Sequence, residues 1–227
     1  MPLTRGAGRY APSPTGQLHL GNLRTAVVAW LFARSTDRRF LLRIEDLDFS
    51  RVRPGLAEQQ RADLTALGVE FDEPIMVQSQ RMASYEQALA RLAERSYECF
   101  CTRREIAEAA SAPHGPVGRY PGTCRDLTEV ERATRRAMRS PALRLRAAGD
   151  ETPTYAHVPL AVNSAGQRLA KRDGPVTLSD LAKQGVSPAH VLQIIACTLD
   201  LMSPGERASL ADLLERFEPQ RIPRSPG

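Results

Sequence analysis

Lysine is almost absent from this sequence. Of 31 basic residues only Lys171 and Lys183 are lysines, and the rest are arginines. Arginine presents a broad planar fork, whereas lysine is a compact charge on a flexible stem. A site that needs one point charge on a small moving group would favour lysine, which makes Lys171, in the stretch QRLAKRDG, a candidate functional residue. The alternative is that two lysines remain by chance in an arginine-rich composition.

Long apolar runs are also missing. No stretch approaches the roughly 18–20 apolar residues of a membrane span. The start MPLTRGAGRYAPSPTG has no apolar core, so it is not a secretory signal. We therefore expect a cytoplasmic protein with no membrane partner. The net charge of +5 and pI near 9.3 are compatible with a polyanionic partner, although many basic proteins bind no nucleic acid.

Cysteine is scarce, and its distribution is uneven. Cys99, Cys101 and Cys124 lie close together in the sequence, whereas Cys197 stands alone and is expected in the core. In a reducing compartment such a cluster suggests a metal before a disulfide, and three thiolates suit a tetrahedral zinc site. Chemistry alone leaves the fourth ligand open, with His114 as the ordinary choice. The alternative is three reduced cysteines without a metal.

The order of predicted elements indicates an α/β fold. Residues 9–16 form a short strand and turn, 22–35 a helix and 38–48 a buried strand that ends in acids, which together make a βαβ unit and argue for a parallel sheet. The apolar face of this helix has helical spacing and comprises Leu23, Ala26, Val27, Trp30 and Leu31. Further helices are predicted at 54–70, 79–97, 127–139, 177–184, 188–199 and 207–217, and further strands at 141–147 and 155–163.

We expect four parts along the chain. Residues 1–97 would be the first half of a nucleotide-binding catalytic domain, and 98–126 a small zinc-binding insert. Residues 127–176 would complete the catalytic domain with the loop around Lys171, and 177–227 would form C-terminal helices and a tail. A loop insert of this size has little core of its own, so a metal would supply its folding energy.

The stretch APSPTGQLHLGNLR has the chemistry of a phosphate site. Gly16 and Gly21 let the backbone approach a ligand, while His19 and Asn22 sit at the start of a helix, where N–H groups and the helix dipole favour anions. Lys171 could then meet charge that develops on phosphates. The alternatives are a plain strand–turn–helix corner capped by Asn22 and a solvated basic turn around Lys171.

Taken together, these stretches resemble a known family. HLGN and LAKRD resemble the two signature sequences of class I aminoacyl-tRNA synthetases, and RYAPSPTGQLHLGNLRTA with RIEDLD resembles their glutamyl branch. The short length, without room for a C-terminal anticodon-binding domain, resembles the glutamyl-queuosine tRNA(Asp) synthetases, which are free-standing paralogs of the glutamyl-tRNA synthetase catalytic domain. The resemblance covers about residues 5–220. It implies a Rossmann-like, doubly wound parallel sheet with a zinc-binding insert and C-terminal helices.

The resemblance also implies an activity and its residues. A monomeric enzyme would activate glutamate with ATP and Mg²⁺, then transfer glutamate to the queuosine base of tRNA(Asp). Glutamate would contact Arg9, Tyr10, Ala11, Pro12, Ser13 and Glu45; ATP would contact His19, Gly21, Asn22 and Lys171, with His19 and Lys171 catalytic; zinc would be held by Cys99, Cys101, Tyr120 and Cys124. Without the resemblance, Arg9 reads as a surface charge and Glu45 as a strand-end acid.

The sequence departs from the family pattern in three places. Asn22 stands where many class I members have a second histidine, and Arg168 and Ala170 stand where the fuller loop motif has lysine and serine. These differences leave fewer hydrogen-bond donors for ATP than the full motifs would supply.

A segment of the fold is also missing from the sequence. The first half of the fold and its insert occupy residues 9–146, and the chain then passes directly from the candidate strand in ALRLRAAGDE to the one in PTYAHVPL. Only about thirty residues remain before the Lys171 loop, and they can supply one strand but not a second βαβαβ half. Members of the resembled family have there a tyrosine and an arginine that complete the glutamate site, and Tyr155 does not match that tyrosine. Either the protein lacks the segment or this sequence is an incomplete version of it. A catalytically inactive RNA- or protein-binding module and a truncated glutamyl-tRNA synthetase therefore remain alternatives.

Overall fold

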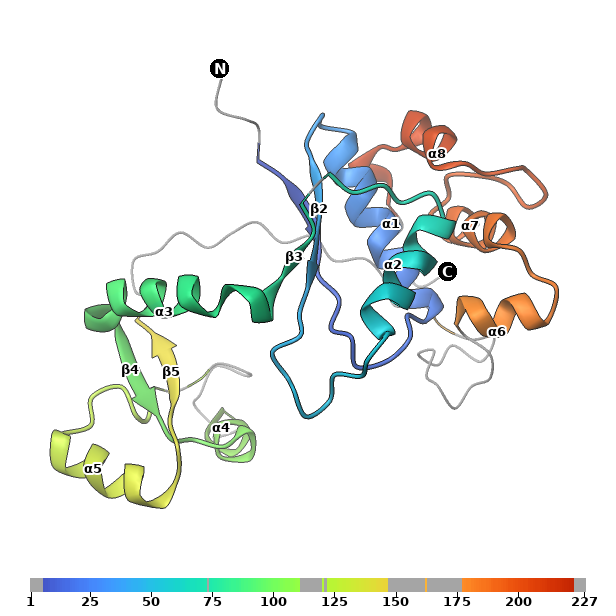
Figure 1. Cartoon of the computed structure of the whole chain (residues 1–227). Helices are drawn as coiled ribbons and strands as arrows, with labels where there is room; N and C mark the ends of the chain where they lie inside the picture. The colour runs from blue at the N-terminus through green and yellow to red at the C-terminus, as the bar shows by residue number, and fades with distance from the viewer. Residues whose placement is uncertain are drawn as a thin grey trace. The chain divides into compact units, whose positions relative to one another are not determined.

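The computed structural model describes residues 6–72, 74–110, 120, 122–146, 162 and 177–222 (Figure 1). The chain divides into two compact units, and each is described by itself. The first unit joins Met1–Arg81 to Tyr155–Gly227, and the second is Met82–Thr154. The predicted zinc-binding insert, 98–126, lies within the second unit. None of the helices in the described part of the chain combines the length and hydropathy that a membrane span requires.

The first unit is built on a parallel sheet. Strand β1 (Gly8–Tyr10) pairs with β2 (Phe40–Ile44), and β2 pairs with β3 (Met76–Val77), so the order is β1-β2-β3. Helix α1 (Leu20–Arg34) connects β1 to β2, and α2 (Leu56–Ala66) connects β2 to β3. The predicted βαβ unit is therefore confirmed, and the carboxyl ends of β1 and β2 lie at the same edge of the sheet.

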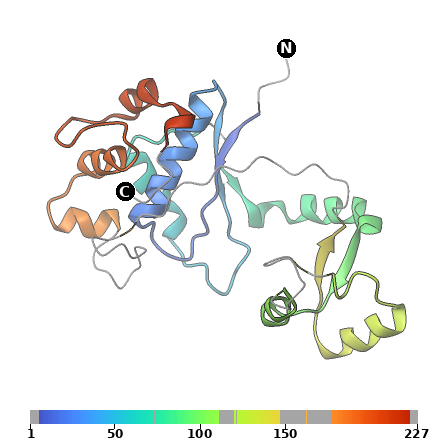
Figure 2. The ribbon, with the colours of Figure 1, turned by 180° about the vertical axis from the view of Figure 1, so that it is seen from behind.

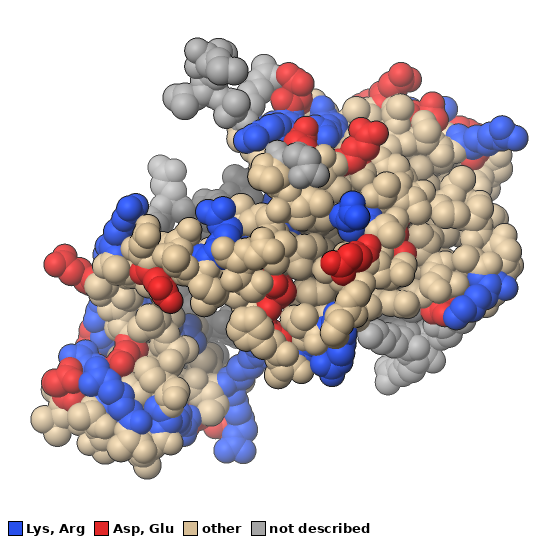
Figure 3. Space-filling view, viewed as in Figure 1, with Lys and Arg blue, Asp and Glu red and all other residues tan. Residues whose placement is uncertain are grey.

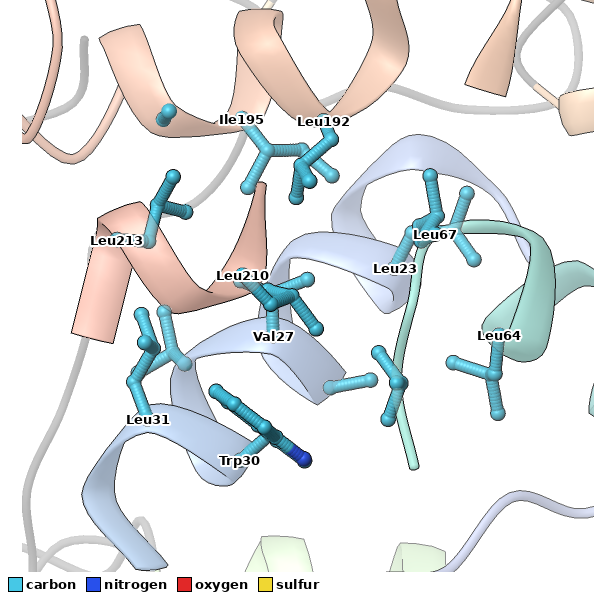
Figure 4. Packing of buried hydrophobic residues seen from close by; sticks show 14 of the residues in the cluster. Leu23, Val27, Trp30, Leu31, Leu64, Leu67, Leu192, Ile195, Leu210 and Leu213 are labelled. Atoms are coloured by element: carbon cyan, nitrogen blue, oxygen red, sulfur yellow. The ribbon is translucent and has the colours of Figure 1, made fainter. Parts of the chain in front are cut away.

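Helix α1 lies between the sheet and the C-terminal helices in both Figure 1 and Figure 2. Those helices are α6 (Leu178–Lys183), α7 (Pro188–Cys197) and α8 (Leu210–Arg216), as predicted within a few residues. The predicted apolar face of α1 is buried, and Figure 4 shows it packed against Leu192, Ile195, Leu210 and Leu213. Burial of each such side chain contributes roughly 1.5–3 kcal/mol, so this core fixes α1 and the residues at its N-terminus.

The second unit contains a two-stranded antiparallel sheet, β4 (Ser96–Cys99) with β5 (Ala142–Leu145). It also contains α3 (Met82–Arg91), α4 (Arg103–Ala110) and α5 (Glu129–Met138). Its buried core is small and consists of Tyr97, Cys99, Phe100 and Cys124. Basic side chains gather over the surface of this unit around α5 (Figure 3).

Some predicted elements differ from the structure. The predicted helix 79–97 is an α-helix only over Met82–Arg91, and Ser96 and Tyr97 belong to β4, which was not predicted. The reason is tertiary: Tyr97 and Cys99 are buried at the two-residue period of a strand, and β4 pairs with β5. The predicted strand 155–163 lies outside the described residues, apart from Val162.

Candidate functional site

The loop that follows β1 is fixed to the carboxyl end of β2. The Glu45 backbone N–H donates to the Pro12 carbonyl at 2.9 Å, and the Tyr10 hydroxyl donates to the Asn22 carbonyl at 3.3 Å. Burial raises the pKa of Tyr10 to about 12, so its hydroxyl remains a donor at neutral pH. The loop APSPTG therefore runs from the strand edge to the start of α1 along a defined path.

A buried glutamine on α2 holds the same loop through two hydrogen bonds. Gln60 is 1% exposed, and its Nε2 donates to the carbonyls of Ser13 at 3.1 Å and Gly16 at 2.7 Å. These two bonds fix the backbone on both sides of the turn at Pro14 and Thr15. The sequence analysis did not identify Gln60. The feature that could have revealed Gln60 is its spacing: it precedes Asp63 and Leu64 by three and four positions, which places it on the same buried face of α2.

His19 begins α1 as its N-cap and forms a capping box with Asn22. The Asn22 backbone N–H donates to His19 Nδ1 at 3.3 Å, and the His19 backbone N–H donates to Asn22 Oδ1 at 3.2 Å. Because Nδ1 accepts, the proton of a neutral His19 ring is assigned to Nε2, which is then a donor. The N-terminus of α1 adds a partial positive charge at the same place.

These groups surround a cavity of about 520 Å³. Of the predicted site residues, Tyr10, Ala11, Pro12, Ser13, His19 and Asn22 line it. Its wall is completed by Thr15, Gly16, Gln17, Leu18, Thr25, Arg51 and Gln60. A cavity that combines backbone amides, a histidine, a helix N-terminus and an arginine can bind an anionic ligand.

Three predicted residues do not line this cavity. Arg9 is exposed on β1, and the Gly21 carbonyl accepts a hydrogen bond from Thr25 Oγ1 at 2.8 Å within α1. The Glu45 carboxylate pairs with the Arg43 guanidinium. Glu45 nevertheless follows β2 directly, at the sheet edge where the loop after β1 begins.

The first described residue after the predicted signature loop contacts this site. Lys171 itself lies outside the described residues, as do Arg168 and Ala170. Thr177, which follows that stretch, is buried and forms an isolated antiparallel bridge with His19. Thr177 also caps α6, since its Oγ1 accepts from the Asp180 backbone N–H at 3.2 Å. Thr177 is therefore held beside His19.

The second unit holds the predicted metal ligands close together. The Sγ atoms of Cys99, Cys101 and Cys124 all lie within 4.8 Å of one another. The Tyr120 hydroxyl lies 3.2 Å from Cys99 Sγ and accepts from the Cys124 backbone N–H at 3.0 Å. Around a tetrahedral zinc, sulfurs bound at about 2.3 Å would stand roughly 3.8 Å apart. The four side chains fit a zinc ion after small shifts, and His114 lies outside the described residues.

The electrostatics of this cluster also suit a cation. Burial raises the pKa of Cys99, but hydrogen bonding with Tyr120 and the neighbouring Arg144 outweigh burial and lower it to about 7. Burial and the neighbouring Cys124 raise the pKa of Cys101 to about 11. A metal would remove this conflict between adjacent thiolates, because metal ligands bind deprotonated.

Arg144 lies over this cluster. Its guanidinium carbon is 3.9 Å from the centroid of the Tyr120 ring. Its Nε is buried without a hydrogen-bond partner among the described residues. A positive group in this position would balance the excess negative charge of three thiolates if they held one divalent ion.

Comparison with known proteins decides the family. A sequence profile described as "tRNA synthetases class I (E and Q), catalytic domain" matches residues 7–152. A glutamyl-Q tRNA(Asp) synthetase from Nocardia farcinica is 46% identical, over 99% of this chain and 93% of that protein. The chain belongs to the glutamyl-Q tRNA(Asp) synthetase family of class I tRNA synthetases. The same kind of synthetase from Symbiobacterium thermophilum is 36% identical, over 96% of this chain and 94% of that protein.

Solved structures show that this synthetase has the class I catalytic fold. A glutamate tRNA ligase from Elizabethkingia meningosepticum, in complex with its amino acid, superposes with a TM-score of 0.69 at 22% identity. The match covers 96% of the present synthetase but only 65% of the ligase. The glutamate-tRNA synthetase of Elizabethkingia anophelis gives a TM-score of 0.70 at 21% identity, covering 97% and 67% of the two chains.

The alignments also show that this synthetase is short. The alignment with the Nocardia protein extends over 296 residues, whereas the chain has 227, so at least 69 aligned positions have no residue here. Because 99% of the chain is aligned, most of these positions are internal. The sequence analysis expected a segment to be missing, and the alignment shows that internal positions have no counterpart in this chain.

Proposed function

We propose that this synthetase activates glutamate with ATP and transfers it to the queuosine base of tRNA(Asp). In the first step a glutamate carboxylate oxygen bonds to the α-phosphorus of ATP, and pyrophosphate leaves with the electrons of the broken P–O bond. In the second step a hydroxyl of queuosine attacks the glutamyl carbonyl, and AMP leaves. The observation that carries the proposal is the cavity at the carboxyl ends of β1 and β2, where His19 and the N-terminus of α1 meet the APSPTG loop.

The residues of this cavity suit the first step. His19 Nε2–H and the N-terminus of α1 would bind phosphate oxygens, and Asn22 holds the His19 ring through the capping box. Gly21 would keep the helix start open to the phosphates. Glutamate would lie along Tyr10–Ser13, with Arg9 facing its side-chain carboxylate and Glu45 its ammonium group. No covalent enzyme intermediate is required, because positioning and charge stabilisation supply the catalysis.

Lys171 is proposed to stabilise the phosphates as negative charge develops on them. The support is the bridge between Thr177 and His19, because Lys171 precedes Thr177 by six residues. Six residues of chain span about 20 Å at most, which limits how far the lysine can lie from Thr177.

The test of Lys171 has a matched control in the same protein. Lys171→Ala should abolish glutamate-dependent ATP–pyrophosphate exchange without changing thermal stability. Lys183→Ala removes the other lysine, which is exposed and pairs with Asp180 at 3.4 Å, and should leave the exchange unchanged. Equal exchange by the wild type and Lys171→Ala would refute the proposed role.

We further propose that Cys99, Cys101, Tyr120 and Cys124 hold one structural zinc ion per chain, and that Mg²⁺ accompanies ATP. When bound, zinc would supply folding energy to the second unit, whose small buried core includes two of the proposed ligands, Cys99 and Cys124. Atomic absorption should give about one zinc per chain for the wild type and much less for Cys124→Ser. A ratio near zero for wild-type protein after mild purification would contradict the site. We also propose a cytoplasmic monomer.

One observation favours a second candidate function. At least 69 positions of the Nocardia protein have no counterpart here. Their loss would delete strands or helices from the second half of a doubly wound sheet and would expose the edges of that sheet. A chain that truly lacks them could be a catalytically inactive module that binds RNA or a protein. A purified mass well above 25.0 kDa would show that the segment exists in the protein. A mass of 25.0 kDa with no pyrophosphate exchange would favour the inactive module.

A further inference from the structure

An aromatic ring stands exposed in the turn between β2 and α2. Phe49 is 70% exposed, although phenylalanine is among the residues most often buried in folded proteins. The turn itself is well defined. Backbone N–H groups of Arg51 and Val52 donate to the Asp48 carbonyl at 2.9 and 3.0 Å, and Ser50 Oγ donates to Asp48 Oδ1 at 2.7 Å. The ring is therefore presented by a fixed backbone.

The turn also belongs to the rim of the cavity. Arg51, in the same turn as Phe49, lines the cavity. A backbone hydrogen bond also attaches this turn to the loop after β1, because the Arg53 N–H donates to the Pro14 carbonyl at 3.1 Å. A large substrate that delivers its reactive group into the cavity across this part of the rim would meet the turn that holds Phe49.

The surroundings of the ring indicate what covers it. The Arg51 side chain is 71% exposed and pairs with Asp48 at 3.7 Å, and Arg53 is exposed beside it. A protein partner would need an apolar patch, but among residues 45–53 the only other exposed large apolar side chain is Leu47, at 38%. A single ring flanked by arginines suits a nucleobase, which stacks on the ring while its phosphates meet the guanidinium groups.

We propose that Phe49 is a stacking platform for a base of the RNA substrate at the entrance to the cavity. The inference rests on the proposed function, because that function brings a tRNA base to this site. Phe49 does not line the cavity, so its role would lie in RNA binding and not in glutamate activation.

Direct binding to tRNA(Asp), measured by filter binding, tests this proposal independently of catalysis. Stacking on an aromatic side chain contributes about 1–3 kcal/mol per base, so Phe49→Ala and Phe49→Leu should each weaken binding roughly 5- to 150-fold. Phe49→Tyr keeps the ring and should bind like the wild type. Leu89→Ala, which trims an exposed apolar side chain of the second unit (47% exposed), should have no effect.

Two further measurements separate stacking from other roles. Because Phe49 has no charge, the salt dependence of binding should keep its slope in all Phe49 variants. ATP–pyrophosphate exchange should be the same in Phe49→Ala as in the wild type.

Unchanged tRNA binding by Phe49→Ala would overturn the proposal. Wild-type binding by Phe49→Leu would also overturn it, because an apolar contact would then suffice without a ring. Loss of pyrophosphate exchange in Phe49→Ala would show instead that the residue supports the cavity. If the wild type binds tRNA(Asp) but transfers no glutamate, the proposed function fails, and the binding comparison still decides the role of Phe49.

Discussion

Replacement of Gln60 by leucine tests whether the cavity depends on support from α2. Leucine cannot donate to the carbonyls of Ser13 and Gly16, which Gln60 contacts at 3.1 and 2.7 Å. Each such bond contributes about 0.5–1.5 kcal/mol net, and more when a buried acceptor is left without a partner. The change also removes Gln60 Oε1, which is buried without a partner among the described residues, and this offsets part of the loss. A net loss of about 2 kcal/mol is expected.

Two measurements should report this loss. For a chain of this length, about 2 kcal/mol corresponds to a fall in Tm of roughly 4–8 °C. If the loop then spends most of its time in other conformations, the apparent affinity for ATP should weaken by up to about 30-fold. The KM for ATP, taken from the pyrophosphate exchange assay, measures this effect.

Gln59 supplies the matched control on the same helix. It is exposed and its Nε2 donates to Asp63 Oδ1 at 2.8 Å, so Gln59→Leu should leave the KM for ATP unchanged. An unchanged KM for ATP in Gln60→Leu, or an equal increase in both variants, would refute the idea that Gln60 positions the loop.

Three further predictions concern polar contacts outside the cavity. Arg24→Leu removes hydrogen bonds of a buried guanidinium to Thr198, at 3.0 and 3.2 Å, and should lower the free energy of unfolding by about 2 kcal/mol in a denaturant titration; no loss would contradict this. Burial raises the pKa of Asp46, but hydrogen bonds from Ser79 outweigh burial and hold this pKa below 3.8. The Asp46 carboxylate therefore stabilises the fold above pH 3.8. This contribution disappears as the pH falls through the lowered pKa. Asp46→Asn should therefore melt below the wild type at pH 7 and approach it near pH 3, whereas a constant difference would contradict the prediction. Arg144→Leu should accelerate zinc loss to a chelator by about 10-fold or more, and an unchanged rate would show that Arg144 does not stabilise the metal site.

The sequence predicted those features that local patterns determine. The helical spacing of Leu23, Val27 and Leu31 predicted the buried face of α1, and the prolines and glycines after Tyr10 predicted the loop that lines the cavity. The spacing of the cysteines also predicted that three thiols would meet. In each case the residues involved are close in the chain, so periodicity or spacing suffices.

Features that depend on distant partners were not predicted. The sequence predicts a helix that includes Ser96 and Tyr97 of β4, because only the pairing of β4 with β5, more than forty residues later, selects an extended conformation there. The roles of Gln60 and Arg24 depend on contacts with Ser13 and Thr198 that local patterns do not reveal. The exposure of Phe49 also depends on the tertiary fold, because it reflects which distant residues pack against the ring.

The transfer reaction tests the central claim most directly. Radiolabelled glutamate and ATP are incubated with the purified synthetase and either queuosine-containing tRNA(Asp) or tRNA(Glu), and the labelled tRNA is then cleaved into fragments. The account predicts label on tRNA(Asp), in the fragment that contains queuosine and not at the 3′ end. Label at the 3′ end of tRNA(Glu) would indicate an ordinary glutamyl-tRNA synthetase, and no label on either tRNA would indicate a module without transfer activity; both results would contradict the account.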